Sequence, residues 1–180
     1  MGGERVVILS DTHGRLPEEV VRACRGAARI VHAGDVGAEE ILPALEAVAP
    51  LTAVSGNVDP PDRAPGRARF EVSGWRVLVQ HIVWDRGGPS SEVRDLLARR
   101  GADLVVFGHS HEPLCERREE TIFFNPGSCG PKRFSFPRSY AEAILRPGEA
   151  HLRILSLDAP PGAPPLLEAR FARPGGVEEG

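Results

Sequence analysis

The sequence predicts an α/β fold built on one mixed β-sheet or on two sheets. In the first two thirds of the chain, short apolar runs alternate with segments that carry helix signals. In the last third, apolar runs follow one another without helical segments between them. The 180 residues, 41% of them hydrophobic and 26% charged, suffice for one globular domain with a full core.

The expected strands are short runs rich in Val, Ile, Leu and Phe, each followed by a turn or loop. Nearly continuous apolar runs such as residues 5–9 and 104–107 are typical of strands buried on both faces. Two runs around residue 74 predict a hairpin that turns at Gly74-Trp75. The expected strands cover residues 5–9, 29–32, 51–54, 69–73, 76–80, 104–107, 121–124, 139–145 and 151–157.

Three helices are expected between the earlier strands. The first has Pro17 in its first turn and ends near Gly26, because proline fits a helix start and glycine a helix end. The second lies within residues 38–48, which place apolar side chains at helical spacing. The third is capped by Ser90 or Ser91 and is closed by a glycine.

Residues 1–158 are expected to form the domain, and residues 159–180, rich in proline and glycine, a tail outside its core. The net charge of −3 gives no strong nucleic-acid signal, and no apolar run is long enough to cross a membrane. The amino terminus lacks the pattern of a secretion signal, and the three cysteines lack C-x-x-C spacing. These features favour a cytoplasmic localisation. They leave the cysteines without a role and leave open whether the chain forms a homo-oligomer.

Seven polar residues follow the expected strands, where the loops of an open α/β sheet converge on a binding crevice. Two aspartates, four histidines and one asparagine suit manganese, iron, zinc or nickel better than calcium. Seven ligands exceed what one such ion commonly takes, but they fit two ions that share a carboxylate. The seven residues are Asp11, His13, Asp35, Asn57, His81, His109 and His111.

Each motif alone also has a simpler interpretation. An Asp-x-His pair is commonly a turn aspartate beside a surface histidine, and Asn57 after glycine fits a left-handed turn. His81 fits a hydrogen-bonded core histidine, and a pair of histidines two apart fits ordinary loop chemistry. The order of the motifs and their shared placement after strands favour the metal site. His32 and His151 lie inside expected strands and are interpreted as structural.

These motifs resemble, in order, the motif series of the calcineurin-like metallophosphoesterases. They are Asp11-Thr12-His13-Gly14, Gly34-Asp35, Gly56-Asn57, His81 and Gly108-His109-Ser110-His111. The small size and Asn125-Pro126-Gly127-Ser128 resemble the compact bacterial and archaeal phosphodiesterase branch of that family. The resemblance spans residues 11–128. It implies a four-layer αββα sandwich with two mixed β-sheets and a hydrolase that acts on a small phosphate ester, with a phosphodiester favoured.

The resemblance also implies two divalent transition-metal ions, with manganese first and iron, nickel or zinc as alternatives. One ion would take Asp11, His13, Asp35 and His111, and the other Asp35, Asn57, His81 and His109, with Asp35 bridging. One relative on this fold serves as a protein-interaction scaffold that has lost part of its ligand set. Because all seven positions are filled here, an enzyme is favoured over a scaffold with little or no catalysis.

Two positions depart from the family pattern. Many larger relatives have a histidine after the motif asparagine that protonates the leaving group, and Val58 stands at that position here. Asp59 is the nearest ionisable substitute, and it fits either a catalytic proton donor or a turn aspartate before Pro60. Many compact relatives have His-Gly-His where this chain has His81-Ile82-Val83, so a phosphate-contacting histidine is missing. Both departures concern substrate choice and rate, and neither concerns metal binding.

Overall fold

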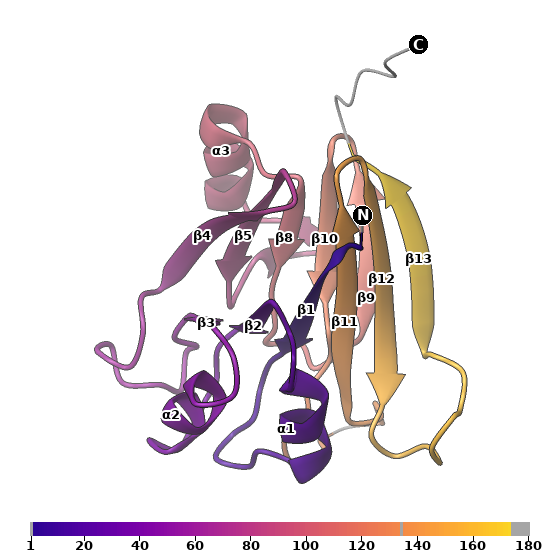
Figure 1. Cartoon of the computed structure of the whole chain (residues 1–180). Coiled ribbons are helices and arrows are strands. Elements are labelled where there is room, and N and C mark those ends of the chain that lie inside the picture. The colour runs from indigo at the N-terminus through magenta and orange to yellow at the C-terminus, as the bar shows by residue number, and fades with distance from the viewer. Residues whose placement is uncertain (1, 134, 174–180) are drawn as a thin grey trace.

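Two β-sheets pack face to face, and helices cover their outer faces (Figure 1). The computed structural model describes residues 2–133 and 135–173. The largest apolar cluster lies between the sheets and includes Ile8 and Val31 from one sheet and Trp75 and Val106 from the other. Separate apolar clusters join the outer face of each sheet to its helices. The four-layer αββα sandwich with two mixed sheets is therefore confirmed.

The first sheet has six strands in the order β13-β12-β11-β1-β2-β3. Strands β1, β2 and β3 pair in parallel, whereas β11, β12 and β13 continue the sheet from β1 in antiparallel fashion. Its strands are β1 (Glu4–Leu9), β2 (Arg29–His32), β3 (Leu51–Ala53), β11 (Ser139–Arg146), β12 (Glu149–Ser156) and β13 (Leu167–Ala172).

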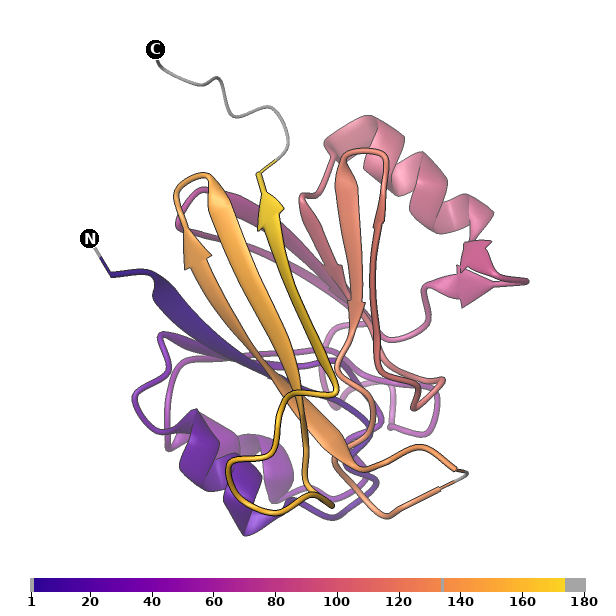
Figure 2. The same ribbon diagram turned by 90° about the vertical axis from the view of Figure 1, so that its right-hand side faces the viewer.

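The second sheet has five strands in the order β4-β5-β8-β10-β9. Its centre is parallel, from β5 through β8 to β10, and each edge strand is antiparallel to its neighbour. A small hairpin of two short strands stands apart from both sheets (Figure 2). The strands are β4 (Arg67–Val72), β5 (Trp75–Gln80), β8 (Leu104–Val106), β9 (Leu114–Arg118) and β10 (Thr121–Asn125), with β6 (Trp84–Asp85) and β7 (Gly88–Pro89) in the hairpin.

Three helices complete the layers: α1 (Glu18–Cys24), α2 (Ile41–Glu46) and α3 (Ser91–Arg100). Helices α1 and α2 bury Val20 and Leu45 against the first sheet, and α3 buries Val93 against the second. The side chain of Ser90 accepts a hydrogen bond from the backbone N–H of Val93, so Ser90 is the N-cap of α3. Helix α2 is shorter than the expected segment 38–48. Nowhere in residues 2–133 and 135–173 is there a helix with the length and hydropathy to cross a membrane.

The structure contains all nine expected strands, and it corrects one turn. The β4–β5 hairpin turns at Ser73 and Gly74, and Trp75 is already the first residue of β5. Both turn residues have positive φ, +48° and +79°, as a two-residue hairpin turn of type I′ requires. Four strands were not expected. The pattern of β9, Leu-Cys-Glu-Arg-Arg, is too charged to predict a strand, and β6 and β7 have two residues each.

The fourth unexpected strand, β13, belongs to the segment that the sequence analysis places outside the core. It pairs with β12 along its whole length, from Glu149↔Ala172 to Ile154↔Leu167. Its Phe171 side chain packs against the cluster between the sheets, so this part of the segment contributes to the core. The proline-rich residues before the strand hid its alternating pattern from sequence analysis. The division at residue 158 stays a prediction, and residues 174–180 lie outside the described residues.

Candidate metal centre

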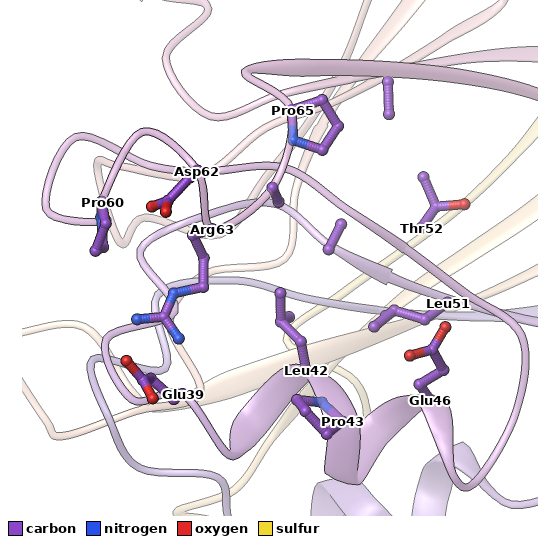
Figure 3. A pocket seen from close by; sticks show the side chains of 13 residues that line it. Glu39, Leu42, Pro43, Glu46, Leu51, Thr52, Pro60, Asp62, Arg63 and Pro65 are labelled. Atoms are coloured by element: carbon purple, nitrogen blue, oxygen red, sulfur yellow. The ribbon is translucent and has the colours of Figure 1, made fainter.

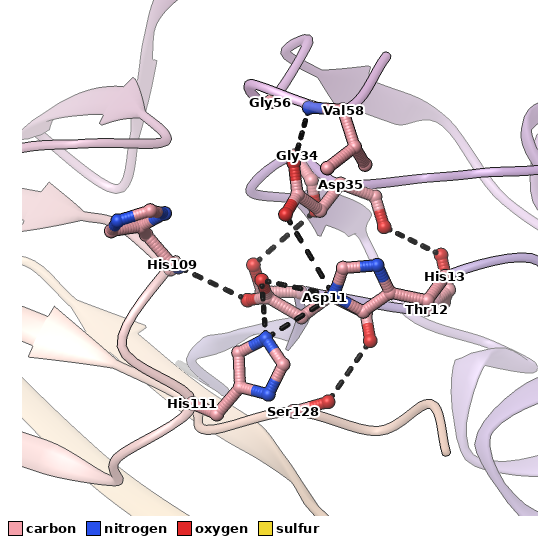
Figure 4. A network of polar contacts seen from close by, with 12 residues as sticks. Asp11, Thr12, His13, Gly34, Asp35, Gly56, Val58, His109, His111 and Ser128 are labelled. Carbon is pink, nitrogen blue, oxygen red and sulfur yellow. Dashed lines mark hydrogen bonds and ion pairs between the residues drawn. The ribbon is translucent and has the colours of Figure 1, made fainter. Parts of the chain in front are cut away.

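Loops from both sheets meet at the carboxyl ends of their parallel strands, and they carry all seven predicted ligands. Figure 4 shows five of the seven: Asp11, His13, Asp35, His109 and His111. The loops after β1, β2 and β3 come from one sheet, and those after β5 and β8 from the other. Because both sheets point these strand ends toward the same edge of the sandwich, residues far apart in sequence become neighbours. The loops contribute, in that order, Asp11 and His13, Asp35, Asn57, His81, and His109 with His111.

A first group consists of Asp11, His13 and His111, which share one small volume. The distance from Nε2 of His111 to Oδ1 of Asp11 is 3.1 Å, and that between the Nε2 atoms of His13 and His111 is 3.2 Å. Metal–nitrogen bonds of about 2.1 Å put neighbouring ligand atoms about 3 Å apart. The spacing therefore fits a single cation between these side chains.

A second group consists of Asp35, His81 and His109, whose ligand atoms lie within 4.8 Å of one another. Nε2 of His81 is 3.2 Å from Oδ1 of Asp35, and the His81 and His109 rings meet nearly at right angles. The amide oxygen of Asn57 lies 2.9 Å from Nδ1 of His109, so Asn57 joins this group. Unlike the first group, it includes two exposed side chains, those of Asn57 and His109.

Asp35 stands between the two groups. Its Oδ1 faces His81, and its Oδ2 is 3.7 Å from Nε2 of His13 in the first group. Burial raises the pKa of Asp35, but the hydrogen bond and charge of His81, the backbone N–H of Val58 and the charge of His13 outweigh it and lower the pKa to about 2. Asp35 is therefore a carboxylate at neutral pH, as a bridging ligand must be.

Two buried atoms at the centre of the site fit cation binding. Oδ1 of Asp11 and Nε2 of His81 make no well-aligned hydrogen bond among the described residues, although His111 and Asp35 lie close to them. Leaving such atoms unsatisfied costs free energy, and a cation between them would remove that cost. The donor set of imidazoles, carboxylates and one amide fits divalent transition metals.

The histidine protonation states fit the same interpretation. Nδ1 of His81 lies 2.7 Å from the carbonyl oxygen of Ala33, to which a neutral ring donates, leaving Nε2 as an acceptor that faces the site. Burial lowers the pKa of His81, but the neighbouring carboxylates of Asp35 and Asp11 raise it overall. Carboxylates that hold a proton on this nitrogen would equally attract a metal cation to it.

His32 is buried between the loops that carry ligands of both groups, and its contacts fit the expected structural role. The backbone N–H of Gly34 donates to its Nδ1, and its Nε2 lies 2.9 Å from the hydroxyl oxygen of Thr12. The Thr12 hydroxyl donates in turn to the carbonyl oxygen of Val36. Complete burial lowers the pKa of His32 to about 4, so the ring is neutral and ties the loop after β1 to the loop after β2.

The backbone is strained where the ligands sit. Left-handed φ is uncommon outside glycine and clusters at functional sites. The ligands with positive φ are Asp11, His13, Asp35, His109 and His111.

Glycines allow the close approach of these loops. A Cβ on Gly34 would lie 2.7 Å from the His81 ring, and one on Gly56 would collide with Asp35. Gly34 also has a φ of +97°. The glycines in the sequence motifs therefore leave room for the ligands beside them.

The carboxylate of Asp59, the hypothetical proton donor, is engaged elsewhere. Its Oδ2 accepts hydrogen bonds from the backbone N–H groups of Val36 and Gly56, and its Oδ1 accepts one from Gly37. Burial raises the pKa of Asp59, but these three hydrogen bonds lower it overall. A carboxyl group held ionised by three donors is a poor general acid, so the contacts favour a structural role that joins the loops after β2 and β3.

Sequence analysis assigned no role to two residues that support the first group. The Ser128 hydroxyl donates to the carbonyl oxygen of Asp11, and the side-chain amide of Asn125 donates to that of Gly108. Both belong to the motif Asn125-Pro126-Gly127-Ser128, which the sequence analysis noted only as a resemblance. Asparagine occurs only twice in the sequence, and this rarity is the signal that could have pointed to Asn125.

A hollow of about 740 Å³ has no predicted ligand in its lining (Figure 3). It is open and lies between α2, the edge strand β3 and the loop 60–65. Its charged side chains are Glu39, Glu46, Asp62 and Arg63, and none of the seven predicted ligands lines it. The convergent buried polar groups, rather than the volume of a hollow, therefore locate the candidate site.

A model of the calcineurin-like phosphoesterase superfamily domain matches residues 5–146. With this fold and this ligand arrangement, the chain belongs to the calcineurin-like phosphoesterase superfamily. It is 36% identical over 138 residues to a probable metallophosphoesterase of Methanothermobacter thermautotrophicus, covering 72% of this chain and 80% of that protein. It is also 31% identical over 163 residues to the phosphodiesterase YfcE of Escherichia coli, covering 76% and 85%.

Solved structures share the fold at lower identity. Vacuolar Protein Sorting 29 from Cryptosporidium parvum superimposes with a TM-score of 0.78 at 18% identity, covering 96% of this chain and all of that one. The YfcE phosphoesterase from E. coli superimposes with a TM-score of 0.68 at 23% identity, covering 92% and 98%. At these identities the superpositions establish the fold alone.

Proposed function

We propose that this protein is a dinuclear metal-dependent phosphodiesterase that hydrolyses a small phosphate ester. One ion would be held by Asp11, His13, Asp35 and His111, and the second by Asp35, Asn57, His81 and His109. The observation that carries the proposal is the position of Asp35, whose two oxygens face the two ligand groups. We propose manganese as the working metal, with iron, nickel and zinc as alternatives.

When bound, two such cations lower the pKa of a shared water and offset the charge that develops on phosphate oxygens during in-line attack. The chain's own residues prepare the site for them. The Ala33 carbonyl selects the His81 tautomer with a free Nε2. The backbone N–H of His109 donates to Oδ2 of Asp11 and leaves Oδ1 of Asp11 to face His111.

The two residues that follow Asn57 supply no ready acid for the leaving group. Val58 is 54% exposed at the position where the family pattern has a histidine, and the Asp59 carboxylate is engaged with backbone donors. An ester whose leaving oxygen is a weak base needs a proton least. We therefore propose that aryl phosphodiesters react faster than alkyl diesters.

The test is hydrolysis of bis(p-nitrophenyl) phosphate by metal-stripped protein with and without added manganese. We expect turnover to depend on the metal and metal analysis to give two ions per chain. The variants His81→Ala and His111→Ala should each lose turnover. His151→Ala should not, because His151 pairs with Glu168 on the β12–β13 surface.

The alternative is a protein-interaction scaffold with little or no catalysis. The fold likeness to Vacuolar Protein Sorting 29 keeps this alternative in view. Two bound ions without turnover of aryl diesters, alkyl diesters or monoesters would favour the scaffold. Metal-dependent turnover that survives in both His81→Ala and His111→Ala would contradict the proposed ligands.

A further inference from the structure

Two loops beside the first ligand group carry cationic side chains. The loop after His13 carries Arg15, and the loop after Ser128 carries Lys132 and Arg133. The loops pack tightly, since the Ser128 hydroxyl donates to the Asp11 carbonyl and a Cβ on Gly130 would collide with the Thr12 carbonyl. Both loops are therefore anchored to the backbone that carries the metal ligands.

A hollow of about 470 Å³ lies between the two loops, a size that accommodates a phosphorylated sugar. Its cations are Arg15, Lys132 and Arg138, and its carboxylate is Glu19, among the described residues. Arg138 is not available to a ligand, because Asp158 accepts a 2.8 Å hydrogen bond from its Nε. The Nζ of Lys132 lies 3.9 Å from the same aspartate and is partly compensated.

Arg15 and Arg133 differ from these cations. Both are exposed, and within residues 2–133 and 135–173 neither side chain makes a hydrogen bond or ion pair. Arg133 lines a neighbouring small hollow together with His111 and Ser128.

We propose that Arg15 and Arg133 bind a second phosphate of the substrate, beyond the one that is hydrolysed. The inference rests on the proposed phosphodiesterase function and specifies its substrate class: diesters that also carry a phosphomonoester, such as nucleotides phosphorylated at two positions. Guanidinium groups bind phosphate through paired N–H donors. Arg15 lines the 470 Å³ hollow and Arg133 lines the adjoining one with His111, so these two guanidiniums supply that chemistry beside the first ligand group.

The test compares two substrates that differ in one phosphate. They are the p-nitrophenyl ester of thymidine 5′-phosphate and the same compound with an added 3′-phosphate. We expect kcat/KM to be about tenfold higher for the second substrate, since a charge-assisted contact is worth about one factor of ten. In the double variant Arg15→Gln, Arg133→Gln the ratio should approach one. Arg86→Gln is the matched control, because Arg86 is exposed in the β6–β7 turn.

A binding measurement separates this inference from the proposed function. Calorimetry with thymidine 3′,5′-bisphosphate and thymidine 5′-monophosphate needs no turnover. Tighter binding of the bisphosphate by about tenfold, lost in the double variant and kept in Arg86→Gln, supports the inference even where hydrolysis is absent. Equal affinity for both nucleotides, or a preference that survives in the double variant, would overturn it while leaving metal-dependent hydrolysis untouched.

Discussion

The two ligand groups differ in how the chain holds them. Asp11, His13 and His111 are enclosed, and the loop that carries Ser128 packs against their backbone. The second group ends in two exposed side chains, Asn57 and His109, which contact each other. Preorganised ligands lose little conformational freedom when an ion binds, whereas exposed side chains must be ordered. We therefore expect the first group to hold a cation more tightly than the second group.

The largest effect should come from Asp35, the residue that the groups share. In Asp35→Asn the amide removes the negative charge from both ion sites, so we expect kcat/KM to fall by about 10³-fold or more. Metal analysis should give fewer than one tightly bound ion per chain. Asp85→Asn, in the exposed β6–β7 hairpin, is the control. Two retained ions with near-normal turnover would disprove the bridging role.

Gly34→Ala should break the second group selectively. The new Cβ would lie 2.7 Å from the His81 ring, so His81 must move, and its three nearest atoms all belong to His81 rather than to the first group. We expect one ion per chain and a loss of about 10–100-fold in turnover. Gly26→Ala is a matched control, because Gly26 also has positive φ but nothing within 4 Å of its added Cβ. If both variants bind two ions, the close approach does not position His81.

His32 connects the loops after β1 and β2, which carry ligands of both groups. Because its ring is neutral when folded, the stability of the metal-free protein depends on pH. Its folded pKa of about 4 lies below 6.5, the ordinary pKa of a histidine, so the unfolded chain binds more protons between these values. Stability is therefore complete above about pH 6.5 and falls by about 3 kcal/mol as the pH drops to 4.

Denaturant unfolding of the metal-free protein at several pH values measures this slope. His32→Gln should flatten it, and His151→Gln, on the β12–β13 surface, should keep it. If His32→Gln fails to fold, an NMR titration of the wild-type imidazole resonances tests the same prediction. His32 should not titrate above about pH 5. A titration near pH 6.5 would contradict the neutral, buried ring.

Sequence analysis predicted the strands and the convergence of the seven residues, because both follow from local patterns. Continuous apolar runs mark buried strands, and polar residues just beyond them mark the loops at one edge of the sheets. The edge strands β9 and β13 were not predicted from the sequence, because an edge strand faces solvent and tolerates charged side chains. Which ligands share a cation depends on how the two sheets face each other, and no local pattern contains that information.

The role of Asp59 was open for the same reason. Its partners Val36 and Gly37 are more than twenty residues away in sequence and become neighbours only when the loops after β2 and β3 meet. In sequence, Asp59 is simply an ionisable residue next to Val58. The structure instead places its carboxylate against backbone donors that support the second group.

Asp59→Asn tests this support and should have the smallest effect. The amide keeps one acceptor oxygen and loses the charge, so backbone donors lose a partner and unfolding should cost about 1–2 kcal/mol less. Because hydrogen bonds hold the pKa of Asp59 below its usual value, the difference should be present at neutral pH and vanish as acid protonates the wild type. Turnover should change only a few-fold, through the second ion, with the shape of its pH profile retained. Loss of the alkaline limb of that profile would instead make Asp59 the proton donor.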